Sequence, residues 1–209
     1  MKLAQLLGLG ACSWSLLFGC ALTSKADALT PRYFNPQTYD ERRSPPAPRP
    51  FELRLGQVSS ASNLDERIAY RLNAVEVGFY EDRRWTELPE QYLRRALETE
   101  LFEERKLTRI VSGVAPILDV ELQAFEEQRG APGKARVVLR FTLRDERRSL
   151  LEQSLELELP LGSDRSADKS ERVAKALGDA LAEGVTRLGA AVVKRLSESP
   201  PAAVETSTP

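Results

Sequence analysis

Three consecutive segments in the second half of the chain alternate between apolar and polar residues. Their apolar positions are Leu118, Val120 and Leu122, then Val137, Leu139, Phe141 and Leu143, then Leu155, Leu157 and Leu159. A period of two places successive side chains on opposite faces of a strand, and polar turns at 130–133 and 145–148 separate the segments. The pattern predicts an antiparallel meander with one buried and one solvated face. On the solvated face we expect Arg140 and Arg144 to pair with a neighbouring acidic strand.

A long amphipathic helix is predicted after the meander. One stripe is formed by Val173, Leu177, Leu181, Val185, Leu188, Val192 and Leu196, with Ala176, Ala180 and Ala191 beside it. Asp164 or Ser166 is expected to cap its start. The opposite face carries acidic as well as basic residues, for example Asp179 and Lys175, whereas helices that lie on membranes usually show a basic face. We therefore expect the stripe to cover the buried face of the sheet.

Shorter patterns before the meander predict the rest of the domain. Alternating runs predict strands over 51–56, 68–72 and 75–79, and a further short strand over 109–111. Pro89 is expected to open a helix, since its missing N–H costs nothing in the first turn. Together these elements predict an α+β domain over 51–199, with a mostly antiparallel sheet and two helices packed on one face.

The N-terminus has the layout of a secretory signal peptide over residues 1–19. Lys2 provides a positive start, and an apolar run ends in Leu17-Phe18-Gly19-Cys20. This tetrapeptide resembles a bacterial lipobox, although a phenylalanine before the glycine is bulkier than usual. The resemblance implies cleavage before Cys20 and lipidation of its thiol. Cys12 is the weaker candidate, because only about six apolar residues precede its motif.

Residues 20–50 are predicted to form a lipidated, proline-rich tether. Prolines among polar residues favour extended conformations of about 3.1 Å per residue, so about thirty residues reach roughly 90 Å. Tyr33, Phe34 and Tyr39 leave open that part of this segment packs along the domain instead. Residues 200–209 are small, polar and bounded by proline, which predicts a disordered tail.

Composition argues against several kinds of chemistry. The chain has no histidine, and its two cysteines both lie in the N-terminal segment. Histidine-dependent nucleophilic sites and ordinary zinc sites are therefore excluded, and we expect no enzyme activity, no metal and no cofactor. Most acidic residues occupy positions typical of solvated strand and helix faces. Lys and Arg number 30 against 31 Asp and Glu without a basic block, so nucleic acid is not an expected partner.

The stretch from Leu64 to Phe102 carries a family resemblance. Strand residues 75–80 end in an aromatic, a polar turn leads to Arg84-Trp85, and Pro89 opens the helix that contains 92–97. A later segment, 118–126, adds to the pattern. In this order and spacing, the chain resembles the ABC-type transport auxiliary lipoprotein family over Pro50 to about Ser197. That family includes the lipoproteins of paraquat-inducible and other MCE-type lipid transport systems.

The resemblance implies a non-enzymatic, lipid-anchored periplasmic component of a system that moves lipids between envelope membranes. Its implied partners are an MCE-domain protein and an ABC permease, with self-association as an open alternative. Ala21, where an aspartate would retain a lipoprotein at the inner membrane of enteric bacteria, implies the outer membrane. The competing hypothesis is an outer-membrane lipoprotein that activates or scaffolds a peptidoglycan synthase or other envelope assembly machinery.

Phe79, Tyr80 and Trp85 are the candidate partner-binding residues. Tyrosine and tryptophan are enriched at the centres of protein interfaces, so an exposed group of them predicts a binding surface. For Trp85 we favour burial against the first helix over exposure, and we expect Tyr80 to be the exposed residue. If these aromatics do not bind the partner, the solvated sheet face around Arg140 and Glu156 is the next candidate.

Overall fold

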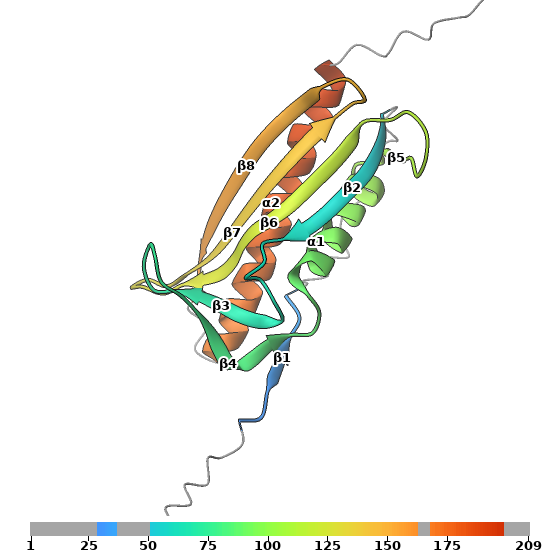
Figure 1. The fold of residues 1–209 in the computed structure, drawn as a ribbon. Helices are drawn as coiled ribbons and strands as arrows, with labels where there is room; N and C mark the ends of the chain where they lie inside the picture. The colour runs from blue at the N-terminus through green and yellow to red at the C-terminus, as the bar shows by residue number, and fades with distance from the viewer. Residues whose placement is uncertain (1–28, 37–50, 163–167, 199–209) are drawn as a thin grey trace, which may run out of the picture.

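The described residues form one eight-stranded mixed sheet with two helices across one of its faces (Figure 1). The structure, a computed structural model, describes residues 29–36, 51–162 and 168–198. The strands are β1 (Arg32–Phe34), β2 (Glu52–Ser60), β3 (Arg67–Arg71), β4 (Val77–Trp85), β5 (Thr108–Arg109), β6 (Ile117–Gln128), β7 (Lys134–Arg144) and β8 (Ser149–Pro160). The helices are α1 (Pro89–Glu98), which continues as the π-helical turn η1 (Thr99–Glu104), and α2 (Lys169–Glu198).

The predicted meander is confirmed as β6, β7 and β8, which pair antiparallel along their lengths. Phe141 of β7, for example, lies opposite Val120 of β6 and Gln153 of β8. Apolar side chains such as Leu118, Leu139 and Phe141 are buried under the helices. The period of two in the sequence thus corresponds to the two faces of this part of the sheet.

The other edge of β6 is shared by two parallel neighbours. β2 pairs with its first half, from Arg54 opposite Ile117 to Ser60 opposite Leu122. β3 pairs with its end, from Ala69 opposite Glu126 to Arg71 opposite Gln128. β5 then joins β2 in parallel, while β4 joins β3 antiparallel and β1 joins β4 in parallel. The α+β prediction is confirmed, and the sheet is mixed because of these parallel pairs.

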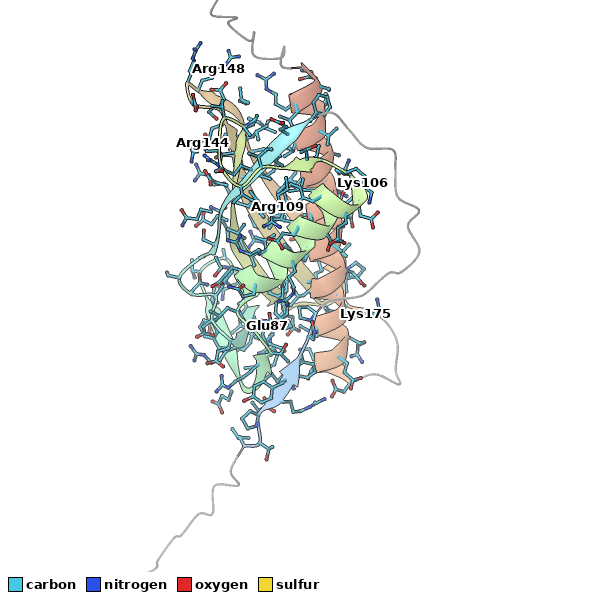
Figure 2. All side chains as sticks on the ribbon, turned by 90° about the vertical axis from the view of Figure 1, so that its right-hand side faces the viewer. Glu87, Lys106, Arg109, Arg144, Arg148 and Lys175 are labelled. Carbon is cyan, nitrogen blue, oxygen red and sulfur yellow. The ribbon has the colours of Figure 1, made fainter. Side chains whose placement is uncertain are left out.

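Both helices lie on the same face of the sheet, as predicted. α2 runs along β6, β7 and β8, while α1 packs on β2 and β6. Every residue of the predicted stripe of α2 is buried. Figure 2 views the two layers edge-on, with Arg144 on the sheet side and Lys175 on the outer side of α2. Burial of one stripe of α2 under one face of the meander therefore forms the core.

β2 runs past Gly56, where the sequence suggested its end. A Cβ at Gly56 would lie only 2.2 Å from Oδ1 of Asp119 on β6. The same oxygen accepts a hydrogen bond from the Gln57 N–H at 2.7 Å, and the register of β2 against β6 shifts between Leu55 and Val58. The glycine therefore marks a bulge with a close approach between strands, and β2 continues beyond it.

Part of the predicted tether packs on the domain. β1 pairs with the end of β4, the Thr86 N–H donates to the Phe34 carbonyl at 3.0 Å, and the Phe34 side chain packs against the core. A Cβ at Gly178 of α2 would lie 1.7 Å from the Pro36 carbonyl oxygen, so the chain crosses the helix where no side chain is in the way. Tyr33 is 62% exposed. Residues 1–28, with both cysteines, and 37–50, with Tyr39, lie outside the described residues.

α2 begins with a capping box centred on Asp168. The Asp168 carboxylate accepts from the Glu171 N–H at 2.9 Å, and the Glu171 carboxylate accepts from the Asp168 N–H at 3.3 Å. Asp168 also pairs with Arg32 of β1 at 2.5 Å. The expected caps Asp164 and Ser166 lie outside the described residues, and Asp168 holds the capping position. It therefore joins the start of α2 to β1.

Asp168→Ala is expected to lower the free energy of unfolding by about 1 kcal/mol near neutral pH, because the cap is lost. The hydrogen bond from the Glu171 N–H, assisted by Arg32, lowers the pKa of Asp168 to about 2. Since the unfolded pKa is about 3.9, this carboxylate adds stability above that pH and loses it as the pH falls toward 2. Urea unfolding of both proteins at pH 7, 4 and 2.5 should show a difference that shrinks with acid. Asp168→Asn, which keeps a capping oxygen, should lose less at pH 7, and a difference independent of pH would contradict the prediction.

Candidate interaction site

Trp85 is a core residue, as favoured from the sequence. Its side chain is 2% exposed at the end of β4. The ring centroid lies 5.0 Å from that of Phe125 on β6 and 6.2 Å from that of Tyr92 on α1. The Tyr92 hydroxyl in turn accepts from the Glu87 N–H at 3.0 Å, which fixes the turn between β4 and α1. Trp85 therefore joins the first helix to the sheet.

The expectation that Tyr80 is exposed is wrong. Tyr80 is 9% exposed, and its ring packs edge-on against Tyr70 at 5.1 Å. Simple alternation would put Tyr80 and Trp85 on opposite faces of β4. The register against β3 instead changes from Arg67 opposite Arg84 to Ala69 opposite Phe79. Between these two register positions β4 advances by five residues while β3 advances by two. The bulge in β4 lets the side chains of Tyr80 and Trp85 both point toward the core.

Phe79 is the member of the predicted aromatic set that keeps some surface. It is half-buried, and the Arg67 guanidinium lies over its ring at 4.4 Å. Arg67 is itself held by Asp65, with Nη2 2.8 Å from Oδ2. A partner that reaches this part of the domain would therefore meet a ring already covered by a cation. The role of Phe79, Tyr80 and Trp85 in partner binding stays a prediction.

Two consecutive glutamates at the end of β6 are buried on opposite faces of the sheet. Glu126 and Glu127 are each 1% exposed, unlike the solvated acidic residues that the sequence pattern suggested. The register of β6 against β7 shifts between Leu122 and Ala124, so beyond this bulge Phe125 and Glu127 face the core in place of the even-numbered positions. Simple alternation from Leu118, Val120 and Leu122 does not place Glu127 on the core face, so the sequence pattern gave no signal for its burial. Buried carboxylates need charged or hydrogen-bonding partners, and both have them.

Glu126 is held by two arginines on the solvated side of the sheet. It accepts from Arg71 Nε at 2.6 Å and Nη2 at 3.2 Å, and from Arg136 Nη1 at 2.9 Å. Arg136 Nε also donates to Glu156 of β8 at 2.6 Å. Burial opposes the charge on Arg136, but its hydrogen bonds to Glu156 and Glu126 outweigh burial and raise its pKa. The network joins β3, β6, β7 and β8 across the sheet.

Glu127 is held by polar groups on the helix side. It accepts from the Tyr80 hydroxyl, pairs with Lys169 Nζ at 2.8 Å, and lies 3.8 Å from Arg129 Nε. The Arg129 guanidinium in turn lies 3.3 Å from the centre of the Tyr70 ring. The Tyr80 hydroxyl thus donates inside the protein and is not available to a partner. The network ties β4 and the start of α2 to β6.

Three further ion pairs cross between strands on the solvated face, and two of them confirm the pairing expected for Arg140 and Arg144. Arg140 Nη2 lies 2.6 Å from Glu152, and Arg144 Nε lies 3.0 Å from Asp119. Lys134 Nζ lies 2.7 Å from Glu158. The pairs run from acidic β6 to basic β7 to acidic β8, and Arg144 projects from the side away from α2 (Figure 2).

These charged and aromatic contacts hold the strands and the start of α2 together. Within 29–36, 51–162 and 168–198, no group of three or more histidine, cysteine, aspartate or glutamate side chains is placed to hold a metal ion. In the same residues no helix is long and apolar enough to cross a membrane. Both buried carboxylates, Glu126 and Glu127, are occupied by charged or hydrogen-bonding partners.

Comparisons with known proteins agree with the sequence resemblance. The family model of the ABC-type transport auxiliary lipoprotein component matches residues 36–198. No curated protein matches the sequence.

Solved structures with the same fold include protein XCC0632 of Xanthomonas campestris, assigned to family DUF330. The two chains are 18% identical with a TM-score of 0.67, over 80% of this chain and 97% of that one. A second crystal structure, of an uncharacterised protein, is 15% identical with a TM-score of 0.59, over 78% and 99% of the two chains. At these identities the likeness concerns the fold. Because the family model covers more than half of the sequence, the chain belongs to the ABC-type transport auxiliary lipoprotein family.

Proposed function

We propose that the protein is a lipid-anchored periplasmic component of an MCE-type ABC system that moves lipids between the envelope membranes. The observation that carries the proposal is membership of the auxiliary lipoprotein family over residues 36–198. The lipobox-like motif at Cys20 supports a membrane anchor, and the absence of histidine supports a role without catalysis. The protein then acts by binding and positioning its partners.

The pairing of β1 with β4 limits how far the domain can stand from its lipid. If Cys20 is the lipidated residue, only Ala21 to Pro31 separate it from β1. Eleven residues span at most about 40 Å when fully extended. A free tether to residue 50 would reach roughly 90 Å. The domain would therefore work close to the membrane surface, at the lipid-proximal end of any assembly that crosses the periplasm.

Affinity purification of the full-length chain from envelopes of its native host, in mild detergent, tests the partners. We expect an MCE-domain protein and an ABC permease or its ATPase to co-purify, because an auxiliary component must contact its transporter. A matched purification of the Cys20→Ala protein controls for membrane fragments that are carried along. Recovery of a peptidoglycan synthase without either transport component would overturn the proposal in favour of the competing hypothesis.

Cys20→Ala is expected to abolish lipidation and to leave the protein either uncleaved or soluble in the periplasm, because its thiol is the proposed attachment point. Incorporation of labelled palmitate and fractionation of the envelope measure both effects. Cys12→Ala is the matched control and should leave labelling unchanged. Full labelling of Cys20→Ala together with its loss in Cys12→Ala would show that the anchor is at Cys12.

A further inference from the structure

The outer edge of the sheet is formed by β8. This strand is 12 residues long and, among the described residues, pairs only with β7. Figure 1 shows it at the margin of the sheet, with α2 behind the sheet. A long edge strand presents backbone N–H and C=O groups that can pair with another strand. Proteins that bind extended segments use such edges, with the backbone providing affinity and the side chains specificity.

One hydrogen bond just after β8, together with the register against β7, shows which residues of β8 direct their backbone groups outward. The Leu161 N–H donates to the Gly133 carbonyl of the preceding turn at 3.1 Å, and Leu159 lies opposite Ala135. In an antiparallel pair every second residue directs both its N–H and its C=O to the partner strand. In β8 the odd-numbered residues from Leu151 onward therefore direct their backbone groups to β7. Glu152, Ser154, Glu156 and Glu158 consequently direct their backbone groups to the free edge. Pro160, without an N–H, suits the same outward side.

The side chains of these outward-facing positions continue a charge pattern across the solvated face. β6 contributes Asp119, Glu121 and Glu126, β7 contributes Lys134, Arg136, Arg140 and Arg144, and β8 contributes Glu152, Glu156 and Glu158. Acidic, basic and acidic strands thus follow one another, and opposite charges across strands are favourable. The cations of β7 already pair with Glu152, Glu156 and Glu158, but these glutamate side chains stay 55%, 53% and 33% exposed. A strand added beyond β8 would continue the order if it were basic.

The helix side of β8 is incompletely covered. Leu157 is 4% exposed, whereas Leu151, Leu155 and Leu159 are only half-buried although they pack against the core. Apolar side chains of an added strand would lie beside these leucines and remove more of their surface from water. Pairing with β8 of a second copy is unfavourable, because antiparallel β8 strands would bring their glutamate rows opposite each other.

We propose that the outer edge of β8 is a strand-addition site for an extended segment of a partner protein in which basic residues alternate with apolar ones. The basic side chains would face Glu152, Glu156 and Glu158, and the apolar ones would face the half-buried leucines. The site lies on the opposite side of the meander from the predicted aromatic set, and it stands whichever envelope machinery the protein serves.

The test uses the full-length protein in detergent and a synthetic peptide of eleven residues in which lysine and valine alternate. Fluorescence anisotropy measures binding, and hydrogen exchange locates it. We expect binding below 1 mM and slower exchange at the amides of Glu152, Ser154, Glu156 and Glu158. A matched peptide with glutamate in place of lysine should bind at least tenfold more weakly.

Ser154→Pro removes an outward N–H without touching the ladder to β7, and should weaken binding at least tenfold. Ser154→Ala keeps that N–H and should stay within twofold of the wild type. Glu152→Lys leaves the backbone unaltered, and should weaken binding of the lysine peptide and strengthen binding of the glutamate peptide.

Three results would overturn the proposal. They are no binding of the lysine peptide at 1 mM, slower exchange only outside β8, and equal binding by a Ser154→Pro protein whose melting curve is unchanged. Self-association that Ser154→Pro removes would make a second copy the occupant and overturn it as well.

Discussion

Trp85→Ala is expected to lower the free energy of unfolding by about 3–5 kcal/mol. The indole is 2% exposed and contacts both Phe125 of β6 and Tyr92 of α1, so its removal leaves a cavity between the first helix and the sheet. Thermal and urea unfolding measure the loss. For a domain of this size each kcal/mol corresponds to about 2–4 °C, so the melting temperature should fall by roughly 6–20 °C.

Phe79→Ala is the matched control for this prediction. It removes an aromatic side chain from the same strand, but one that is half-buried and covered by Arg67. Less apolar surface returns to water, so the loss of stability should be clearly smaller than that of Trp85→Ala. Equal losses for the two variants would contradict the assignment of Trp85 as the core anchor. Because Tyr80 is also buried, a Tyr80→Ala protein needs the same unfolding measurement before any change in binding is interpreted.

Arg71→Met should have the second-largest effect. It removes two of the hydrogen bonds that hold the buried Glu126 carboxylate, the donors lying 2.6 and 3.2 Å away. Breaking a buried ion pair from one side costs about 3–5 kcal/mol, and because Arg136 still contacts Glu126 we expect about 3 kcal/mol. Urea unfolding at neutral pH measures the change. The double variant Arg71→Met with Glu126→Gln should recover part of the loss, since the uncompensated charge is then gone.

Arg140→Met tests whether burial of the ion pair is the reason for the large loss of stability expected for Arg71→Met. Arg140 and Glu152 form a pair on the same face of the sheet, with side chains 54% and 55% exposed. Exposed pairs contribute about 0–1 kcal/mol, so this variant should lose no more than that. A similar loss for Arg71→Met and Arg140→Met would mean that the Glu126 network is ordinary surface charge.

Local patterns in the sequence were sufficient for the elements that bury one regular face. The alternation in β6, β7 and β8 and the stripe of α2 each define one apolar side, and a folded chain must bring these sides together. Pro89 could be placed at the start of α1 because its ring fits the first turn and no other part of a helix. The family was also recognisable, since its motifs follow the chain order.

Other features depended on contacts between distant parts of the chain. Alternation does not state strand direction, so the parallel pairing of β2 and β3 with β6 followed only from the fold. Gly56 resembled a strand end, yet it permits a close approach to Asp119. Tyr80 was predicted to be exposed, because the bulge in β4 depends on its register against β3.

The amino-acid sequence specified the α+β class, the apolar face of each main element and the family of this protein. It did so because periodicity and motif order are properties of neighbouring residues. Three features became apparent only in the folded chain: Glu126 and Glu127 are buried, β1 joins the sheet, and β8 keeps a free edge among the described residues. Each of these depends on which distant groups meet: a carboxylate can be buried only where Arg71, Arg136 or Lys169 reaches it, and such partners come together only in the folded chain.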